Sequence, residues 1–290
     1  MIENNDKRDS VGGGSSLSPA CNVLSLFDGM SCGQIALNRA GIKYDNYFAS
    51  EIDKYAIKIT QKNYPNTEQV GSIADLDGTE LPKIDLLFGG SPCQSFSNAG
   101  KGEGFDGSSK LFFEFVRVLE ETKPTYFLLE NVKMKNEWQE IITDILKAQP
   151  VEINSRLLSG QNRPRIYWTN IPGIIQPKDT HVRLIDILEN INFDREPYEE
   201  NYRCSRAVSY KSEKFHTLRA SGGSKTRGIG VCNDLGWWRK LTPIECERLQ
   251  TVPDNYTEGV SNAQRYKMLG NGWTVDVIAY IFSLVPNGVG

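Results

Sequence analysis

The stretch that most constrains this chain runs from Gly89 to Ser97 and reads GGSPCQSFS. It follows the apolar run 84–88, which is bounded by Pro82 and the glycine pair and predicts a buried strand. In α/β proteins, the residues just beyond the carboxyl end of such a strand border the ligand-binding crevice. Cys93 is therefore a candidate nucleophile, although a cysteine after a strand is about as often a small buried hydrophobic residue.

A glycine-rich segment, residues 98–109, follows Cys93. Its composition argues against regular structure and predicts a mobile loop. A thiol beside a mobile loop favours covalent catalysis.

The composition bounds the class of protein. A length of 290 residues allows one large or two modest domains, and 39% hydrophobic with 24% charged residues is ordinary for a soluble globular chain. No apolar run is long enough to cross a bilayer and no signal peptide is visible, so we expect a cytoplasmic protein. Six scattered cysteines and two histidines predict free thiols and argue against a structural metal site.

The order of elements predicts an α/β fold. A disordered tail, residues 1–19, precedes an apolar strand at 22–27, a glycine turn and a helix at 34–40. This unit is typical of dinucleotide-type folds, but its glycines lack the GxGxxG spacing that would favour a nicotinamide cofactor. A second strand, 44–50, ends at Glu51, which is well placed to accept ribose hydroxyls.

A carboxyl group is predicted to share the edge of Cys93. The buried strand 126–129 leads directly into Glu130, and the ends of parallel strands meet at one crevice. A glutamate there is ordinarily a solvated cap. The loop that follows enters another strand, and period-2 alternation predicts a common direction for Gln161, Arg163 and Arg165. Further helices are expected at 111–121, 138–148, 242–250 and 275–284.

Positive charge is concentrated in one region. Residues 202–240 hold nine basic against two acidic side chains, a net +7 in a chain of net charge −3. Such segregation is typical of a phosphate-binding face, although a solvated basic loop would look the same. From about residue 191 the sequence is polar and has the composition of loops. This predicts a separate, smaller domain over 191–263, with 20–190 and 264–290 forming the larger one.

Taken together, these motifs resemble those of the DNA (cytosine-5)-methyltransferases, of the stand-alone bacterial or phage type. The resemblance covers nearly the whole chain from residue 21. Its motifs stand in the family's order: Phe27 to Gly33, Glu51, Ser91-Pro92-Cys93-Gln94, Glu130-Asn131-Val132, Gln161 to Arg165, Arg239-Lys240-Leu241 with Glu245, and Gly270-Asn271-Gly272.

The resemblance implies a Rossmann-like S-adenosylmethionine-dependent methyltransferase sheet with a smaller target-recognition domain at 191–263. The implied reaction is methylation of C5 of a flipped-out cytosine. Cys93 would attack C6, Glu130 would hold N3, Arg165 would contact the carbonyl oxygen, and Arg163 would help to keep the thiol ionised.

The resemblance also assigns the binding residues. S-adenosylmethionine would contact Phe27, Asp28, Gly29, Gly33, Glu51, Ile52, Ile73, Pro92, Leu111, Asn271, Gly272 and Trp273. Double-stranded DNA would contact Ser97, Gln161, Lys214, Thr217, Arg219, Lys225 and Arg227. We expect a monomer, and whether a cognate restriction endonuclease acts separately stays open.

Two departures from the family pattern stand out. Ser72 occupies a position that is usually acidic, and Asp75 is an open candidate to compensate for it. Asn271-Gly272-Trp273 replaces the commoner Asn-Ser-Val and is similar to animal de novo methyltransferases. Two alternatives remain, a tRNA cytosine-5 methyltransferase and an inactive DNA-binding relative.

Overall fold

The computed structural model of the chain describes residues 21–91, 110–193, 207–220, 229–235 and 237–286. The predicted tail at 1–19, the glycine-rich loop at 98–109 and Cys93 itself lie outside these ranges.

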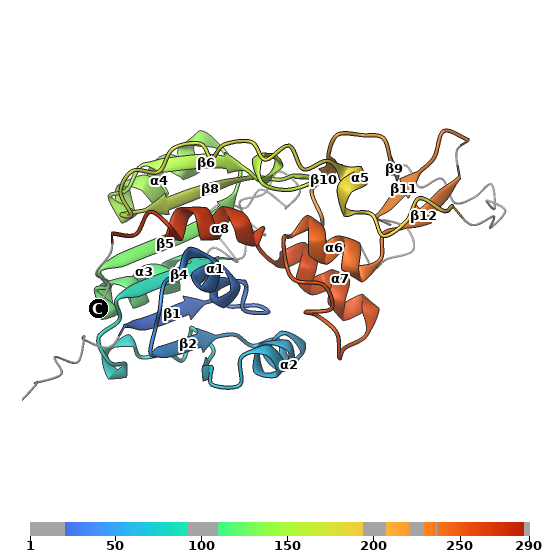
Figure 1. Cartoon of the computed structure of the whole chain (residues 1–290). Helices are drawn as coiled ribbons and strands as arrows, with labels where there is room; N and C mark the ends of the chain where they lie inside the picture. The colour runs from blue at the N-terminus through green and yellow to red at the C-terminus, as the bar shows by residue number, and fades with distance from the viewer. Residues whose placement is uncertain (1–20, 92–109, 194–206, 221–228, 236, 287–290) are drawn as a thin grey trace, which may run out of the picture.

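A seven-stranded sheet forms the centre of the molecule (Figure 1). Its order is β3-β2-β1-β4-β5-β8-β6, and β8 alone runs antiparallel to its neighbours. The strands are β1 (Asn22–Leu26), β2 (Asn46–Ser50), β3 (Glu68–Gly71), β4 (Leu86–Gly90), β5 (Tyr126–Val132), β6 (Pro150–Asn154) and β8 (Pro164–Thr169). The predicted α/β fold is therefore confirmed.

Helices cover both faces of this sheet, because its strands are apolar on both sides. Val23 and Phe88 point to one face, where they pack with α1 (Cys32–Ala40) and α8 (Val275–Phe282). Leu24 and Leu87 point to the other face, toward α3 (Lys110–Thr122) and α4 (Asn136–Leu146). A further helix beside the sheet is α2 (Lys54–Asn63), which Asp53 caps by accepting a hydrogen bond from the Tyr55 amide. Within the part of the chain that the structure covers, no helix has the length and apolarity needed to cross a membrane.

The second part of the chain lies beside the edge of the sheet (Figure 1). It contains a small sheet of β9 (Ala207–Ser209), β11 (Gly230–Cys232) and β12 (Trp238–Lys240), together with α5 (Leu184–Ile187), α6 (Pro243–Leu249) and α7 (Asn262–Asn271). A strand pair crosses the boundary expected at residue 191, since β10 (Phe215–His216) pairs with β7 (Gln161–Asn162). One hydrophobic core also runs from Val23 through Phe215 to Leu241. Short 3-10 turns occur at Gly78–Glu80 and Ser155–Leu157.

The helix expected at 242–250 is confirmed as α6. Thr242 accepts a hydrogen bond from the Glu245 amide, and the Glu245 carboxylate accepts one from the Thr242 amide. Glu245 is wholly buried and also forms an ion pair with Arg239, at 2.7 Å. The ion pair between Arg239 and Glu245 therefore fixes β12 against α6.

Candidate active site

A cavity of about 440 Å³ opens beyond the carboxyl ends of β1, β2, β4 and β5. Parallel strands place their following loops at this edge of a sheet. At one end, Ser91 follows β4, Glu130 lies near the end of β5, and Arg165 lies on the neighbouring β8. The side chains at the other end follow β1 and β2, and include Asp28, Glu51 and Ile52. One continuous cavity thus joins the two groups of residues predicted from the sequence.

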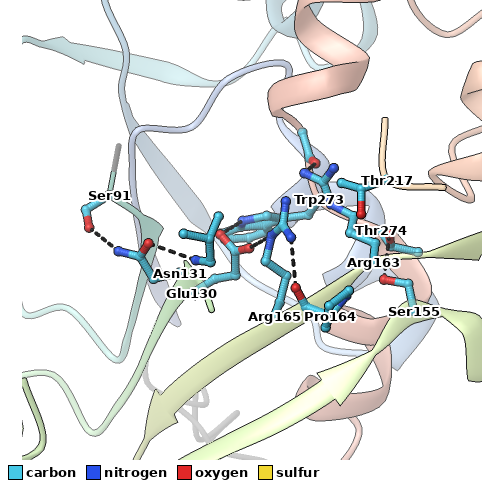
Figure 2. Close-up of polar contacts among 12 residues, drawn as sticks. Ser91, Glu130, Asn131, Ser155, Arg163, Pro164, Arg165, Thr217, Trp273 and Thr274 are labelled. Atoms are coloured by element: carbon cyan, nitrogen blue, oxygen red, sulfur yellow. Dashed lines mark hydrogen bonds and ion pairs between the residues drawn. The ribbon is translucent and has the colours of Figure 1, made fainter. Parts of the chain in front are cut away.

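The carboxyl group of Glu130 is held at both oxygen atoms (Figure 2). Its Oε1 lies 2.8 Å from Nε of Arg165, and its Oε2 accepts a hydrogen bond from Nε1 of Trp273 at 3.2 Å. Gly90, which pairs with Glu130 across β4 and β5, leaves room for this contact. A Cβ atom at Gly90 would lie 2.9 Å from both Glu130 Oε2 and Trp273 Nε1, so any larger residue would displace them.

A second contact ties the ends of β4 and β5 together. Nδ2 of Asn131 donates to Oγ of Ser91 at 3.1 Å, and both side chains are buried (Figure 2). Ser91 borders the cavity beside Glu130. Cys93 and Pro92 follow Ser91 in the sequence but lie outside the described residues, so their placement stays a prediction.

The two arginines of the predicted strand differ in what they bind. Both Arg163 and Arg165 border the cavity, but only Arg165 forms an ion pair with Glu130. Arg163 is 3% exposed and donates to the carbonyl oxygens of Leu218, Gly270 and Gly272. Arg163 therefore joins the end of α7 to the segment that follows β10.

Gln161 lies close to Arg163, since both are buried and both form hydrogen bonds to the backbone of Leu218. It is wholly buried, its Nε2 donates to Leu249 and Gln250, and its Oε1 accepts from the Leu218 amide. The side-chain amide of Gln161 is thus used within the protein, and its contact with DNA stays a prediction.

At the other end of the cavity, a tight turn follows β1. Phe27 and Gly29 have positive φ angles of 57° and 61°, which bring Asp28 inward between them. Oδ1 of Asp28 accepts hydrogen bonds from Tyr47 at 2.7 Å and Ser31 at 3.3 Å. Its Oδ2 is buried without a hydrogen-bond partner among the described residues. Burial raises the pKa of Asp28 to about 6.

Glu51 is fixed by backbone amides at the end of β2. Oε2 accepts from Gly29 at 2.7 Å, and Oε1 accepts from Ile52 at 2.7 Å and Asp53 at 2.8 Å. The neighbouring Ile52 is 78% exposed although it is a large apolar residue. Further predicted residues that line this cavity are Phe27, Gly29, Ile73, Leu111, Asn271, Gly272 and Trp273.

Gly33 does not border the cavity in the part of the chain that the structure describes, and its contact with S-adenosylmethionine stays a prediction. It lies inside α1 against Phe88 and Tyr47, and a Cβ atom there would be 2.4 Å from the Phe88 ring. Gly33 therefore allows α1 to pack closely on the sheet. Asp75 is also away from the cavity and exposed, whereas Ser72 borders it. Asp75 does not take the place of an acidic residue at position 72.

Sequence reasoning missed an ion pair at the rim. Nζ of Lys267 lies 2.6 Å from Oδ2 of Asp53, and both residues border the cavity. Lys267 precedes Asn271 by four positions on α7, so helical spacing was a signal that places both on one face. Cys32, at the start of α1, also borders the cavity and was not predicted to do so.

The predicted DNA contacts are spread over the β10 region. Thr217 Oγ1 donates to the Asn162 carbonyl at 2.8 Å, and Lys214 Nζ donates to the Val182 carbonyl at 2.6 Å and to that of Ser159. Arg219 is exposed. Ser97, Lys225 and Arg227 lie outside the described residues.

Comparison with known proteins gives consistent matches. The model of the family described as C-5 cytosine-specific DNA methylase matches residues 21–167 and 135–286. Type II methyltransferase M1.ScrFI of Lactococcus lactis subsp. cremoris is 32% identical over 88% of this chain and 75% of the relative. Type II methyltransferase M.NlaX of Neisseria lactamica is 30% identical over 89% of this chain and 94% of the relative.

Solved structures show the same fold at low sequence identity. The methyltransferase EhMeth of Entamoeba histolytica has a TM-score of 0.76 at 20% identity, covering 91% of this chain and 97% of that one. The Dnmt2 methyltransferase of S. pombe has a TM-score of 0.74 at 22% identity, covering 91% and 98%.

Proposed function

The chain belongs to the C-5 cytosine-specific DNA methylase family, and from this premise we propose that it methylates C5 of a flipped-out cytosine in double-stranded DNA. The methyl donor in this proposal is S-adenosylmethionine, and the reaction passes through a covalent bond between Cys93 and C6 of the base. The observation that carries the proposal is the Glu130 carboxyl group, held by Arg165 and Trp273 at one end of the cavity.

The other end of the cavity fits S-adenosylmethionine. The donor bears positive charge on its sulfonium and ammonium groups, and the unpartnered buried oxygen of Asp28 is a suitable acceptor for the ammonium. Glu51, fixed by three amides, has the acceptor chemistry that ribose hydroxyls need. The exposed Ile52, with Ile73 and Leu111, offers apolar surface for a planar base. When bound, S-adenosylmethionine supplies an electrophilic methyl group.

The residues at the Glu130 end would activate the cytosine. Attack of the Cys93 thiolate forms a sulfur–carbon bond at C6, and the electron pair of the C5–C6 double bond moves so that C5 becomes nucleophilic. Glu130 binds at N3. It takes up a proton from solvent when the base binds and delivers that proton to N3 as negative charge develops on the ring. Arg165 holds the carboxyl group in place, and its guanidinium adds positive charge at this end of the cavity. C5 then gains the methyl group, and a base, such as a water molecule, takes the C5 proton. The electrons of that C–H bond restore the C5–C6 double bond as the thiolate leaves, and N3 returns its added proton to Glu130.

This chemistry requires a base that has left the duplex, because an enzyme cannot reach the target atom of a base that is stacked inside it. The segment 202–240, with its net charge of +7, is the proposed contact with the phosphates.

An assay with two substrates tests the proposal. Purified protein is incubated with labelled S-adenosylmethionine and either duplex oligonucleotides of mixed sequence or tRNA. We expect label in the DNA, at C5 of cytosine. Label that enters only tRNA would support the RNA-modifying alternative, and binding to DNA without any transfer would support an inactive relative.

Asp28→Asn should raise the stability of the protein at high pH and lower its affinity for S-adenosylmethionine. Burial raises the folded-state pKa from 3.8 to about 6, so the contribution of Asp28 to stability is full below about pH 4 and is lost as pH rises through about 6. Removing the buried charge should therefore raise the melting temperature at about pH 8. Affinity for S-adenosylmethionine should fall about 10-fold or more, because a charged acceptor is lost.

Melting curves and calorimetric titrations from about pH 5 to pH 8 measure both effects. In the wild-type protein, cofactor affinity should rise with pH as Asp28 ionises, and this rise should be absent in Asp28→Asn. The exposed Asp75→Asn serves as the matched control. Lower stability of Asp28→Asn at high pH, with unchanged cofactor affinity, would contradict the assignment.

Arg219→Ala should weaken binding to all DNA sequences and reduce the salt dependence of binding by about one counterion. Arg219 is exposed next to Thr217-Leu218, whereas Lys211 is paired with Asp234 and Lys214 donates to backbone carbonyls. Lys211→Ala is thus the matched control, with little change expected. Fluorescence anisotropy measures the slope of DNA affinity against salt concentration. Equal slopes for Arg219→Ala and the wild type would show that Arg219 does not bind phosphates.

A further inference from the structure

The indole of Trp273 has a contact that cofactor binding does not explain. Its Nε1–H group points to the Glu130 carboxyl group rather than into the cofactor end of the cavity, and it donates to Oε2 at 3.2 Å (Figure 2). The other oxygen, Oε1, is bound by Arg165 at 2.8 Å. Each oxygen of this carboxylate therefore has its own donor, from a different part of the chain.

We propose that Trp273 is a positioning residue for Glu130, which sets the plane of the carboxyl group in which N3 of the target cytosine is bound. This inference rests on the proposed function. With donors on both sides, the carboxyl group does not rotate about its terminal bond without breaking both contacts. A group fixed in this way is already oriented for proton transfer before the base arrives.

The ring of Trp273 is itself well fixed. It packs against Phe88, with ring centroids 5.8 Å apart, and Phe88 in turn packs on Phe282 of α8 at 5.1 Å. Its Nε1 would be only 2.9 Å from a Cβ atom at Gly90, so the indole lies directly on the β4 backbone. The position of the donor is thus set by the core of the sheet.

The backbone around Trp273 is anchored on both sides. The Gly272 carbonyl accepts hydrogen bonds from Arg163 at 3.0 Å and Gln250 at 3.1 Å. Oγ1 of Thr274 donates to Gln250 at 2.9 Å and accepts from Ser155 at 2.9 Å. The commoner Asn-Ser-Val pattern at this place carries a valine, which has no side-chain donor. Tryptophan therefore adds a contact that the valine form lacks.

Trp273→Phe tests the proposal, because it keeps an aromatic ring and removes the N–H group. Single-turnover methyl transfer at saturating S-adenosylmethionine should slow about 10-fold or more, on the scale of a lost hydrogen bond to a charged group. The dissociation constant for DNA should change by less than about 2-fold, and saturating S-adenosylmethionine keeps any change in cofactor affinity out of the measured rate. Trp168→Phe is the matched control, since it loses an indole bond of the same kind, to Thr143, away from the cavity. A Trp273→Phe effect confined to cofactor affinity would overturn the proposal.

A double-mutant comparison with Glu130→Gln tells positioning from general loss of structure. If Trp273 acts through the Glu130 carboxylate, Trp273→Phe should cause little further slowing in the Glu130→Gln background. Full additivity of the two effects would overturn the proposal. A normal melting temperature for Trp273→Phe keeps the comparison valid, and Trp273→His, which restores a ring N–H donor, provides a second test by partial rescue.

Indole N–H resonances give a readout that does not depend on activity. The chain has five tryptophans, and the Trp273 signal is the one missing from the spectrum of Trp273→Phe. In cofactor-free protein this signal should move on Glu130→Gln, because its acceptor loses its charge. An unmoved signal would overturn the inference even in an active enzyme. Absence of methyl transfer by the wild-type protein, with the signal moved as expected, would instead count against the proposed function alone.

Discussion

Cys93→Ala is expected to abolish methyl transfer and covalent capture of DNA together. In the proposed mechanism the sulfur of Cys93 bonds to C6 of cytosine, and no other step makes C5 nucleophilic. DNA that contains 5-fluorocytosine should therefore be trapped by the wild-type protein, because fluorine at C5 prevents the elimination that releases the thiolate. The adduct is measured as a band of reduced mobility on a denaturing gel.

Cys32 is the natural control for this experiment, since it is the cysteine that borders the cavity among the described residues. Burial raises the pKa of its thiol to about 12, so it stays protonated at neutral pH and is a poor nucleophile. Cys32→Ala should still form the adduct. If the adduct persists in Cys93→Ala and is lost in Cys32→Ala, then Cys32 is the nucleophile and the assignment of Cys93 is wrong.

The parts of the fold that the sequence predicts well are those determined by local pattern. The apolar runs before Asp28, Gly89 and Glu130 become β1, β4 and β5, because each is bounded by glycine, proline or an acidic residue. The carboxyl ends of parallel strands share one edge of a sheet, and Asp28, Glu51 and Glu130, at the ends of three such strands, border one cavity. Thr242 and Pro243 likewise locate the start of α6.

The parts that could not be predicted depend on contacts between distant segments. The indole of Trp273 reaches Glu130 across 143 positions, and its direction depends on how α8 returns to the sheet. The packing of Gln161 and Gly33 could not be predicted from their places in motifs. Gln161 satisfies buried backbone groups, and Gly33 lets α1 approach Phe88. Local periodicity describes a strand or helix, not the element against which it packs.

Glu130→Gln is expected to slow methyl transfer about 100-fold or more while the protein stays folded. The amide has the shape of the carboxyl group but neither its charge nor its proton, so it no longer protonates N3 of the ring. The two contacts that Glu130 receives from Arg165 and Trp273 change as well. Arg165 and Trp273 both donate to Glu130, and an amide offers one acceptor and one donor, so one of the two N–H groups would face a second donor.

The rate under single-turnover conditions, with melting temperature as a check on folding, measures this effect. Glu152→Gln is a suitable control, because Glu152 lies on β6 of the same sheet, is half exposed and pairs with Lys133 outside the cavity. Near-normal transfer by Glu130→Gln would remove the proton-transfer role from Glu130. If transfer is slow but 5-fluorocytosine DNA is still captured, then Glu130 acts after the sulfur bond has formed. If both are lost, protonation at N3 accompanies the attack of Cys93, as the proposed mechanism requires.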